Sequence, residues 1–144
     1  MRVLVIHGPN LNLLGEREPE IYGTQTLPEL NEFIASHARE LGVDLDCMQY
    51  NSEGDIISAL HDARTRYDAV IINPGAYSHY SYAIADAIGS IHIPVIEVHL
   101  TNIAARESHR RTSVTAAACT GSVAGFGARS YVLALRSLAQ IPEK

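Results

Sequence analysis

Hydrophobic and polar positions alternate along the chain between short apolar runs and longer stretches with helical periodicity. Residues 2–7 (RVLVIH) form an almost unbroken apolar run, which is typical of a parallel strand that helices cover on both faces. Thr26, with Glu29 three residues later, resembles a capping box and predicts the start of a helix. The predicted apolar face of this helix comprises Leu30, Phe33, Ile34, Ala38 and Leu41. Gly42 is expected to end it.

The same alternation continues to the C-terminus. Residues 43–50 alternate with a period of two, which predicts a strand at the sheet edge with one wet face. Ser52 is expected to cap a second helix, whose apolar face comprises Ile56, Leu60 and Ala63. The pattern then predicts a buried strand at 69–72, a helix at 78–89, strands at 94–100 and about 119–124, and a final helix from about 128 to 140.

Strands separated by helices predict an α/β fold with right-handed crossovers. We expect a single doubly wound, flavodoxin-like sheet of five parallel strands with helices on both faces, forming one domain over residues 1–144. Such sheets bind ligands beyond the carboxyl ends of their strands. The loops after the first, third and fourth strands are therefore where chemistry is expected.

Composition narrows the possible functions. With 47% hydrophobic residues, 19% charged residues and a net charge of -5, the chain is expected to be soluble, globular and unsuited to binding nucleic acid. The apolar run at the N-terminus is too short for a membrane span and lacks the layout of a signal peptide, so a cytoplasmic location is predicted. Cys47 and Cys119 have no C-x-x-C spacing, which favours buried thiols over a disulfide or zinc site.

The cationic residues exclude further chemistry. Ten of the eleven are arginine, and the only lysine is Lys144. Schiff-base catalysis and a Walker-type phosphate loop each need a lysine held within the fold. Arginine instead offers a permanent charge and a planar fork of donors that suits carboxylates.

The loop after the first strand runs from residue 8 to about 25, well beyond the roughly 2–6 residues that are usual. It contains Asn10, Arg17 and Tyr22 and is predicted to form a lid; the alternative is a surface excursion. Tyrosine, with a solution pKa near ~10, is a base at neutral pH only if a positive charge favours the phenolate. Arg17 could supply that charge.

The loop after the third strand contains Asn73, Gly75, Ala76 and His79. Glycine allows a close backbone approach, and the next helix offers amide donors, so this is a candidate binding loop. The alternative is a tight turn that Asn73 caps.

Glu97 and His99 interrupt the apolar fourth strand. Residues two apart share one face of a strand, so the carboxylate can orient the imidazole as a general acid requires. The alternative is a partly exposed strand face. Thr101 follows, and Arg106 and Arg110 have the spacing of one helical face, which suits binding of a small acid or, alternatively, a solvated helix.

Three segments together resemble the type II dehydroquinase family: GPNLNLLGEREPEIYG (8–23), NPGAYSHYSYAIADAI (73–88) and PVIEVHLTNIAARESHR (94–110). The resemblance implies dehydration of 3-dehydroquinate to 3-dehydroshikimate through an enolate, without cofactor or metal. Tyr22 would be the base, supported by Arg17. His99, held by Glu97, would be the general acid, and Asn10 would position a water or the enolate oxygen.

The resemblance also implies a binding set and an assembly. The implied substrate-binding residues are Asn73, Gly75, Ala76, His79, Leu100, Thr101, Arg106 and Arg110. Asp86 would reach the site of an adjacent subunit in a homododecamer, a tetramer of trimers. Thr101, Ser108, His109 and Ala116 depart from the usual family residues, which affects the expected binding and assembly but not the acid and base.

Two other functions stay open at this point. The same dehydration could serve the shikimate pathway or quinate catabolism. A non-catalytic flavodoxin-like module is the alternative of another class. A receiver domain, however, would need acidic residues where this chain has His7, Gly8 and Asn73.

Overall fold

The computed structural model describes residues 1–140 and contains one sheet of five parallel strands in the order β2-β1-β3-β4-β5. The strands are β1 (Arg2–His7), β2 (Asp44–Gln49), β3 (Ala69–Asn73), β4 (Val95–His99) and β5 (Gly121–Ala124). The predicted flavodoxin-like α/β fold is confirmed, as is the position of β2 at an edge. β1 has the predicted bounds and β3 is one residue longer than predicted, whereas β2, β4 and β5 are each two residues shorter.

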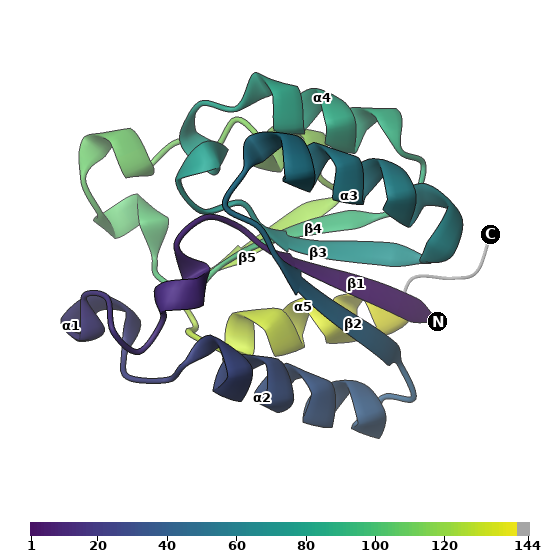
Figure 1. Cartoon of the computed structure of the whole chain (residues 1–144), viewed down its shortest axis with the longest axis horizontal. Coiled ribbons are helices and arrows are strands. Elements are labelled where there is room, and N and C mark those ends of the chain that lie inside the picture. Colours follow the sequence, from purple (N-terminus) through teal and green to yellow (C-terminus); the bar gives the residue numbers. More distant parts are fainter. Residues whose placement is uncertain (141–144) are drawn as a thin grey trace.

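Four helices of two turns or more cover the sheet in two layers (Figure 1). On one face lie α2 (Leu27–Glu40) and α5 (Arg129–Ala139), and on the other lie α3 (Glu53–Arg66) and α4 (Tyr82–Ser90). The remaining elements are short: α1 (Pro19–Tyr22) and the 3-10 turns η1 (Leu11–Leu13), η2 (Gly75–His79), η3 (Ile103–Ala105), η4 (Ser108–Arg110) and η5 (Ala116–Ala118). Most of these short elements lie at the carboxyl end of the sheet.

Alternation along β1 divides the hydrophobic interior into two cores. Val3 and Val5 point toward α2 and α5, whereas Leu4 and Ile6 point toward α3 and α4. Successive side chains of a strand face opposite sides of a sheet, so an apolar run with no polar member buries both faces. This is the physical basis of the doubly wound arrangement.

Helix α2 begins and ends as its sequence predicts. The Thr26 hydroxyl accepts a hydrogen bond from the Glu29 backbone N–H and donates one to the Glu29 carboxylate. At the other end Gly42 has φ +69°, and the N–H groups of Gly42 and Val43 donate to the last free carbonyls of the helix. Leu41, predicted on the apolar face, is exposed because it is the C-cap residue.

The helix predicted at 78–89 begins later than expected. Residues Gly75–His79 form a 3-10 turn, and α4 starts at Tyr82 because the Ser81 hydroxyl caps it by accepting from the Ile84 N–H. Ser52 caps α3 in the same way, as predicted. Within residues 1–140, no helix is both long enough and apolar enough to cross a membrane.

Candidate active site

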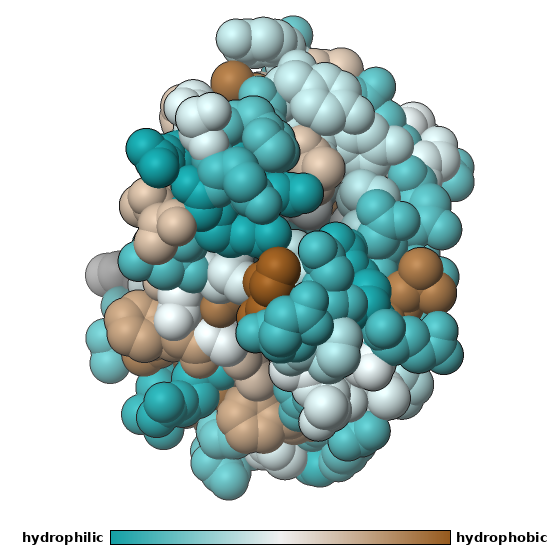
Figure 2. Space-filling model, turned by 90° about the vertical axis from the view of Figure 1, so that its left-hand side faces the viewer, coloured by the Kyte–Doolittle hydropathy of each residue, from teal (hydrophilic) through white to brown (hydrophobic). Residues whose placement is uncertain are grey.

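A pocket opens at the carboxyl end of the sheet, where the loops after β1, β3 and β4 meet. Figure 2 looks onto this end of the molecule and shows a surface dominated by hydrophilic residues, with hydrophobic ones between them. The pocket is lined by Pro9, Asn10, Leu11, Arg17, Tyr22, Asn73, Gly75, Ala76, His79, His99, Leu100, Thr101, Ile103, Arg106 and Arg110. The fold therefore brings together all the predicted site residues except Glu97 and Asp86.

Tyr22 lies between two arginines at the end of α1. The Arg106 guanidinium donates a hydrogen bond of 2.8 Å to the Tyr22 hydroxyl, and its Cζ lies 5.3 Å from the ring centroid. Arg17 lies over the same ring, with Cζ 4.6 Å from the centroid. Arg106 was predicted only as a substrate-binding residue, so the direct contact with the phenol oxygen is new. Both cations therefore lie against the phenol ring, and the Arg106 guanidinium contacts its oxygen directly.

Glu97 and His99 lie on the same face of β4, as their spacing predicts. The His99 Nε2 is 2.8 Å from the Glu97 Oε2, and the His99 ring lines the pocket. Both side chains are buried, so the alternative of an exposed strand face is wrong. Because Nε2 is engaged by the carboxylate, Nδ1 is the ring nitrogen that remains for a ligand.

The Glu97 carboxylate also accepts hydrogen bonds from two hydroxyls that sequence reasoning missed. Ser113 Oγ donates to Oε2 at 2.6 Å, and Thr115 Oγ1 donates to Oε1. Burial by itself raises the pKa of Glu97, but the hydrogen bonds from His99, Ser113 and Thr115 outweigh it and hold that pKa below its usual range. Glu97 is therefore a buried anion at neutral pH.

The turn after β3 is built around Asn73 and Gly75. The Asn73 side-chain oxygen accepts from the Gly75 N–H at 3.1 Å, so the predicted capping interaction is present beside the pocket. Gly75 has φ +59°, and a Cβ added there would lie 3.2 Å from Pro9. Only glycine fits both constraints without strain. His79 is held by a hydrogen bond of 2.9 Å between its Nδ1 and the Thr112 carbonyl.

The backbone at Asn10 is also held in an unusual conformation. Asn10 has φ +67°, in the left-handed region, and its N–H donates to the Asn51 side chain at 3.0 Å. Gln49, at the end of β2, donates to the Gly8 carbonyl and to Asn51. Gln49 and Asn51, at the end of β2 and just after it, therefore position the first loop, and nothing in their local sequence pattern identified them.

The prediction that Arg106 and Arg110 lie on one face of a helix is wrong. Arg106 has an extended backbone between the two 3-10 turns η3 and η4, so the two arginines do not share a helical face. Both nevertheless line the pocket. Arg110 Nε lies 3.1 Å from the Glu107 carboxylate without the geometry of a hydrogen bond. The loop, rather than a helix, brings the two cations together.

Asp86 lies outside this pocket. It is exposed on α4, which lies on the same face of the sheet as α3 (Figure 1). Leu100, Thr101 and Ala76, by contrast, line the pocket through the loops that carry them.

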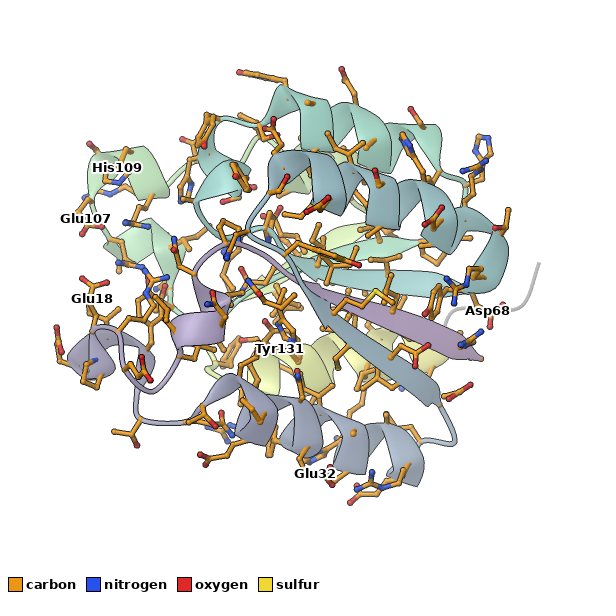
Figure 3. All side chains as sticks on the ribbon, in the orientation of Figure 1. Glu18, Glu32, Asp68, Glu107, His109 and Tyr131 are labelled. Carbon is orange, nitrogen blue, oxygen red and sulfur yellow. The ribbon has the colours of Figure 1, made fainter. Side chains whose placement is uncertain are left out.

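A neutral hydrogen-bonded chain lies behind the pocket and was not predicted. Tyr131, which Figure 3 labels on α5, reaches the carboxyl end of β1 and β3. Its hydroxyl is 3.2 Å from the His7 Nδ1 and accepts from the Asn73 amide at 3.2 Å, while the His7 Nε2 is 2.7 Å from the Asn31 side-chain oxygen. Burial lowers the pKa of His7 to about 4, so this ring is neutral at pH 7.

Comparison with known proteins decides the family. The model of the family described as "Dehydroquinase class II" matches residues 1–139. A 3-dehydroquinate dehydratase of Pelotomaculum thermopropionicum is 52% identical, over 98% of both chains. The type II dehydroquinase structures of Butyrivibrio crossotus and Propionibacterium acnes superpose with TM-scores of 0.94 and 0.93, at 44% and 48% identity. They cover 96% of this chain and 97% and 95% of their own.

The chain belongs to the class II dehydroquinase family. This membership confirms the resemblance seen in the three sequence segments and the prediction that the protein is a dehydratase, that is, a hydro-lyase. It disfavours the alternative of a non-catalytic flavodoxin-like module. In this dehydroquinase, the residues that sequence reasoning missed are those that hold the others in place: Asn31, Gln49, Asn51, Ser113, Thr115 and Tyr131.

Proposed function

We propose that this pocket converts 3-dehydroquinate into 3-dehydroshikimate through an enolate, with Tyr22 as the base and His99 as the acid. The observation that carries the proposal is that Tyr22 and His99, which have neighbours of opposite charge, line the same pocket. Tyr22 is surrounded by cations, whereas His99 is backed by the buried Glu97 carboxylate. An elimination requires one group that takes a proton and another that gives one, and different electrostatic environments suit two groups to these two roles.

In the first step the Tyr22 phenolate removes the proton from C2 of the substrate. Arg106 and Arg17 stabilise the phenolate charge before the transfer. The electrons of the C2–H bond move onto the carbonyl oxygen, which becomes an enolate. Asn10, held beside the pocket, positions a water or this oxygen, so charge is stabilised where it develops.

In the second step the enolate collapses and the bond between C1 and its hydroxyl oxygen breaks. His99 gives a proton to the leaving hydroxyl, which departs as water. Glu97, through its contact with Nε2, stabilises the imidazolium that supplies the proton. The protons taken at Tyr22 and given by His99 balance, so the net reaction is loss of one water.

Binding is assigned to the remaining pocket residues. The strand-four loop, with Leu100 and Thr101, holds the substrate carboxylate, and Arg110 contacts ring hydroxyls. The turn after β3 supplies the rest of the binding site through Asn73, Gly75, Ala76 and His79. This assignment fits an arginine-rich chain, because guanidinium groups suit small oxygen-rich acids.

The whole chain acts as one catalytic domain in a homododecamer, a tetramer of trimers, in the cytoplasm. The exposed position of Asp86 on α4 leaves it free to reach an adjacent subunit's site. The free thiols Cys47 and Cys119 suit a reducing compartment. The expected role is aromatic biosynthesis through the shikimate pathway, with quinate catabolism as the alternative.

The direct test adds 3-dehydroquinate to purified protein and follows the ultraviolet absorbance of the conjugated enone product. Wild type is expected to raise the absorbance, and folded Tyr22→Phe to lose kcat by at least ~10²-fold, because phenylalanine cannot take a proton. Tyr67→Phe is the matched control, since its hydroxyl bonds Asp46 away from the pocket. An undiminished rate in Tyr22→Phe would refute the role of the base.

A second test addresses the covalent alternative. Borohydride added with the substrate is expected to leave no adduct on the protein, because the only lysine is Lys144. Mass spectrometry of the intact chain measures this. A trapped adduct would contradict the proposed mechanism.

A further inference from the structure

The Glu97 carboxylate is surrounded by donors from two separate parts of the chain. His99 comes from the same strand, whereas Ser113 and Thr115 come from the segment between η4 and η5. Glu97 and Thr115 are both 0% exposed. The carboxylate thus has hydroxyl donors on both oxygens and an imidazole on one of them.

The segment that carries these hydroxyls is itself anchored. The Val114 N–H donates to the Ser78 carbonyl at 2.7 Å, and the Ala116 N–H donates to Ser113 Oγ at 3.0 Å. The two hydroxyls also lie 3.2 Å apart. Their positions are therefore set by backbone contacts that do not involve the substrate pocket.

We propose that Ser113 and Thr115, the hydroxyl pair, are positioning residues for the general acid: they keep the Glu97 carboxylate ionised and correctly oriented against His99. This inference rests on the proposed function of His99. A buried carboxylate without donors takes up a proton, because the low-polarity interior penalises its charge. A protonated Glu97 would neither stabilise the His99 imidazolium nor reliably accept from Nε2.

The two hydroxyls are not equivalent. Thr115 is the donor to Oε1, whereas Ser113 shares Oε2 with His99. Loss of the Thr115 hydroxyl leaves Oε1 without a hydrogen-bond partner in residues 1–140, while loss of the Ser113 hydroxyl leaves Oε2 with one. Thr115 is therefore expected to contribute more to ionisation of the carboxylate.

Few other titratable groups face Glu97. Among residues 1–140 these are His99 and the Cys119 thiol, which follows η5. Burial and the charge of Glu97 raise the pKa of Cys119 to about 12, so this thiol stays neutral where the enzyme works. The proposed base Tyr22 also shapes the acidic limb of the pH profile, but it is the same in wild type and in every variant of the hydroxyl pair. A shift of that limb between them therefore reports on the Glu97–His99 pair.

The test compares Thr115→Val, which keeps the shape and removes the hydroxyl, with Thr115→Ser, which keeps the hydroxyl. We expect Thr115→Val to lower kcat about 10- to 100-fold at neutral pH with little change in KM, and to move the acidic limb of the kcat profile to higher pH. Thr115→Ser should restore most of kcat and the position of that limb. Thr65→Val removes an exposed hydroxyl on α3 and is the control.

Infrared titration of the folded variants measures the carboxyl group itself. Thr115→Val should show the band of a protonated, buried carboxylic acid at a pH where wild type does not, and Thr115→Val/Glu97→Gln should lack that band. If Thr115→Val does not fold, Ser113→Ala provides the same two measurements with a smaller expected effect.

The positioning role of the hydroxyl pair would be overturned if folded Thr115→Val kept the kcat, pH profile and infrared titration of wild type. Where only Ser113→Ala folds, the same result in that variant would overturn it. Such a result would leave the proposed function intact, since wild type would still dehydrate the substrate and Tyr22→Phe would not. An inactive wild type would instead reject the proposed function.

Discussion

Two buried histidines, His99 in the lining of the pocket and His7 behind it, differ in what surrounds them. His7, at the end of β1, is 0% exposed, and its ring nitrogens lie at hydrogen-bond distance from two neutral side chains, Tyr131 and Asn31. His99, at the end of β4, contacts the Glu97 carboxylate. Burial without a countercharge lowers the pKa of His7 to about 4, which keeps it neutral at pH 7. The pair shows that partners, more than residue type or strand position, determine what a histidine does.

Direction of hydrogen bonding extends this contrast. A neutral His7 that donates from Nε2 to Asn31 must accept at Nδ1 from the Tyr131 O–H, whose oxygen accepts from the Asn73 amide. This series of hydrogen bonds orients Asn73, and none of its members is charged. The Glu97–His99 pair, in contrast, is suited to moving a proton. We expect substitutions in the two regions to affect different measured quantities.

Replacement of His99, the histidine that contacts a carboxylate, should have the largest effect on kcat. His99→Asn is expected to lower kcat by about 10³-fold, since general acids contribute roughly 10² to 10⁴ in rate. The matched variant His7→Asn should keep a far larger share of kcat, because His7 transfers no proton. Steady-state kinetics on both folded variants measures this. Similar losses in the two would abolish the distinction between them.

The pH dependence of the free energy of unfolding should reveal the contribution of the neutral, buried His7. The unfolded chain takes up a proton on His7 near pH 6.5, the folded protein only near pH 4. The stabilisation from a neutral His7 is therefore complete above pH 6.5 and is lost as pH falls toward 4. At about 1.4 kcal/mol per pH unit, the loss is on the order of 3 kcal/mol.

Urea unfolding of wild type and His7→Asn between pH 7 and pH 4 measures this loss. The free energy of unfolding should fall less steeply with decreasing pH in the variant. The Glu97 contribution has the same sign but a lower window, since its lowered pKa makes that stability disappear only below its ordinary value of 4.5. Parallel curves for the two proteins would contradict a neutral, buried His7.

Removal of the Tyr131 hydroxyl should have a smaller effect on binding. Tyr131→Phe takes away the partner of the Asn73 amide and of His7, at a cost of about 1–2 kcal/mol in stability. KM should rise several-fold as Asn73 loses its fixed orientation, with kcat nearly unchanged. Kinetics with thermal unfolding tests both parts. A fall in kcat at constant KM would place Tyr131 in the proton-transfer region instead.

The smallest expected effect is on the alkylation rates of the two thiols, Cys47 and Cys119. Burial raises the pKa of both Cys47 and Cys119 to about 12, and the Glu97 charge adds to the effect at Cys119. Glu97→Gln should therefore speed alkylation of Cys119 by a few-fold and leave Cys47 unchanged. Mass spectrometry of alkylated peptides distinguishes the thiols. Equal acceleration at both would indicate general loosening of the fold.

Local sequence predicted the elements well where one physical cause acts within a few residues. The Thr26 and Ser52 caps, the Gly42 terminus and the apolar β1 are decided by neighbours along the chain, and all agree with the structure. The helix predicted through Arg106 and Arg110 failed because an i, i+4 spacing reports periodicity, which a loop of 3-10 turns can match by chance.

The resemblance of three sequence segments to the family supplied Tyr22 as the candidate base. The sequence by itself determined the doubly wound sheet, the end of the sheet where chemistry is expected, and the Glu97–His99 pair as the candidate acid. The alternation of apolar runs and the β4 spacing of Glu97 and His99 contain that information. Only the tertiary structure decided which groups support them: Arg106 on Tyr22, the hydroxyl pair on Glu97, and Tyr131 between His7 and Asn73. These contacts join residues 16 to 124 positions apart, and no local periodicity specifies such a distance.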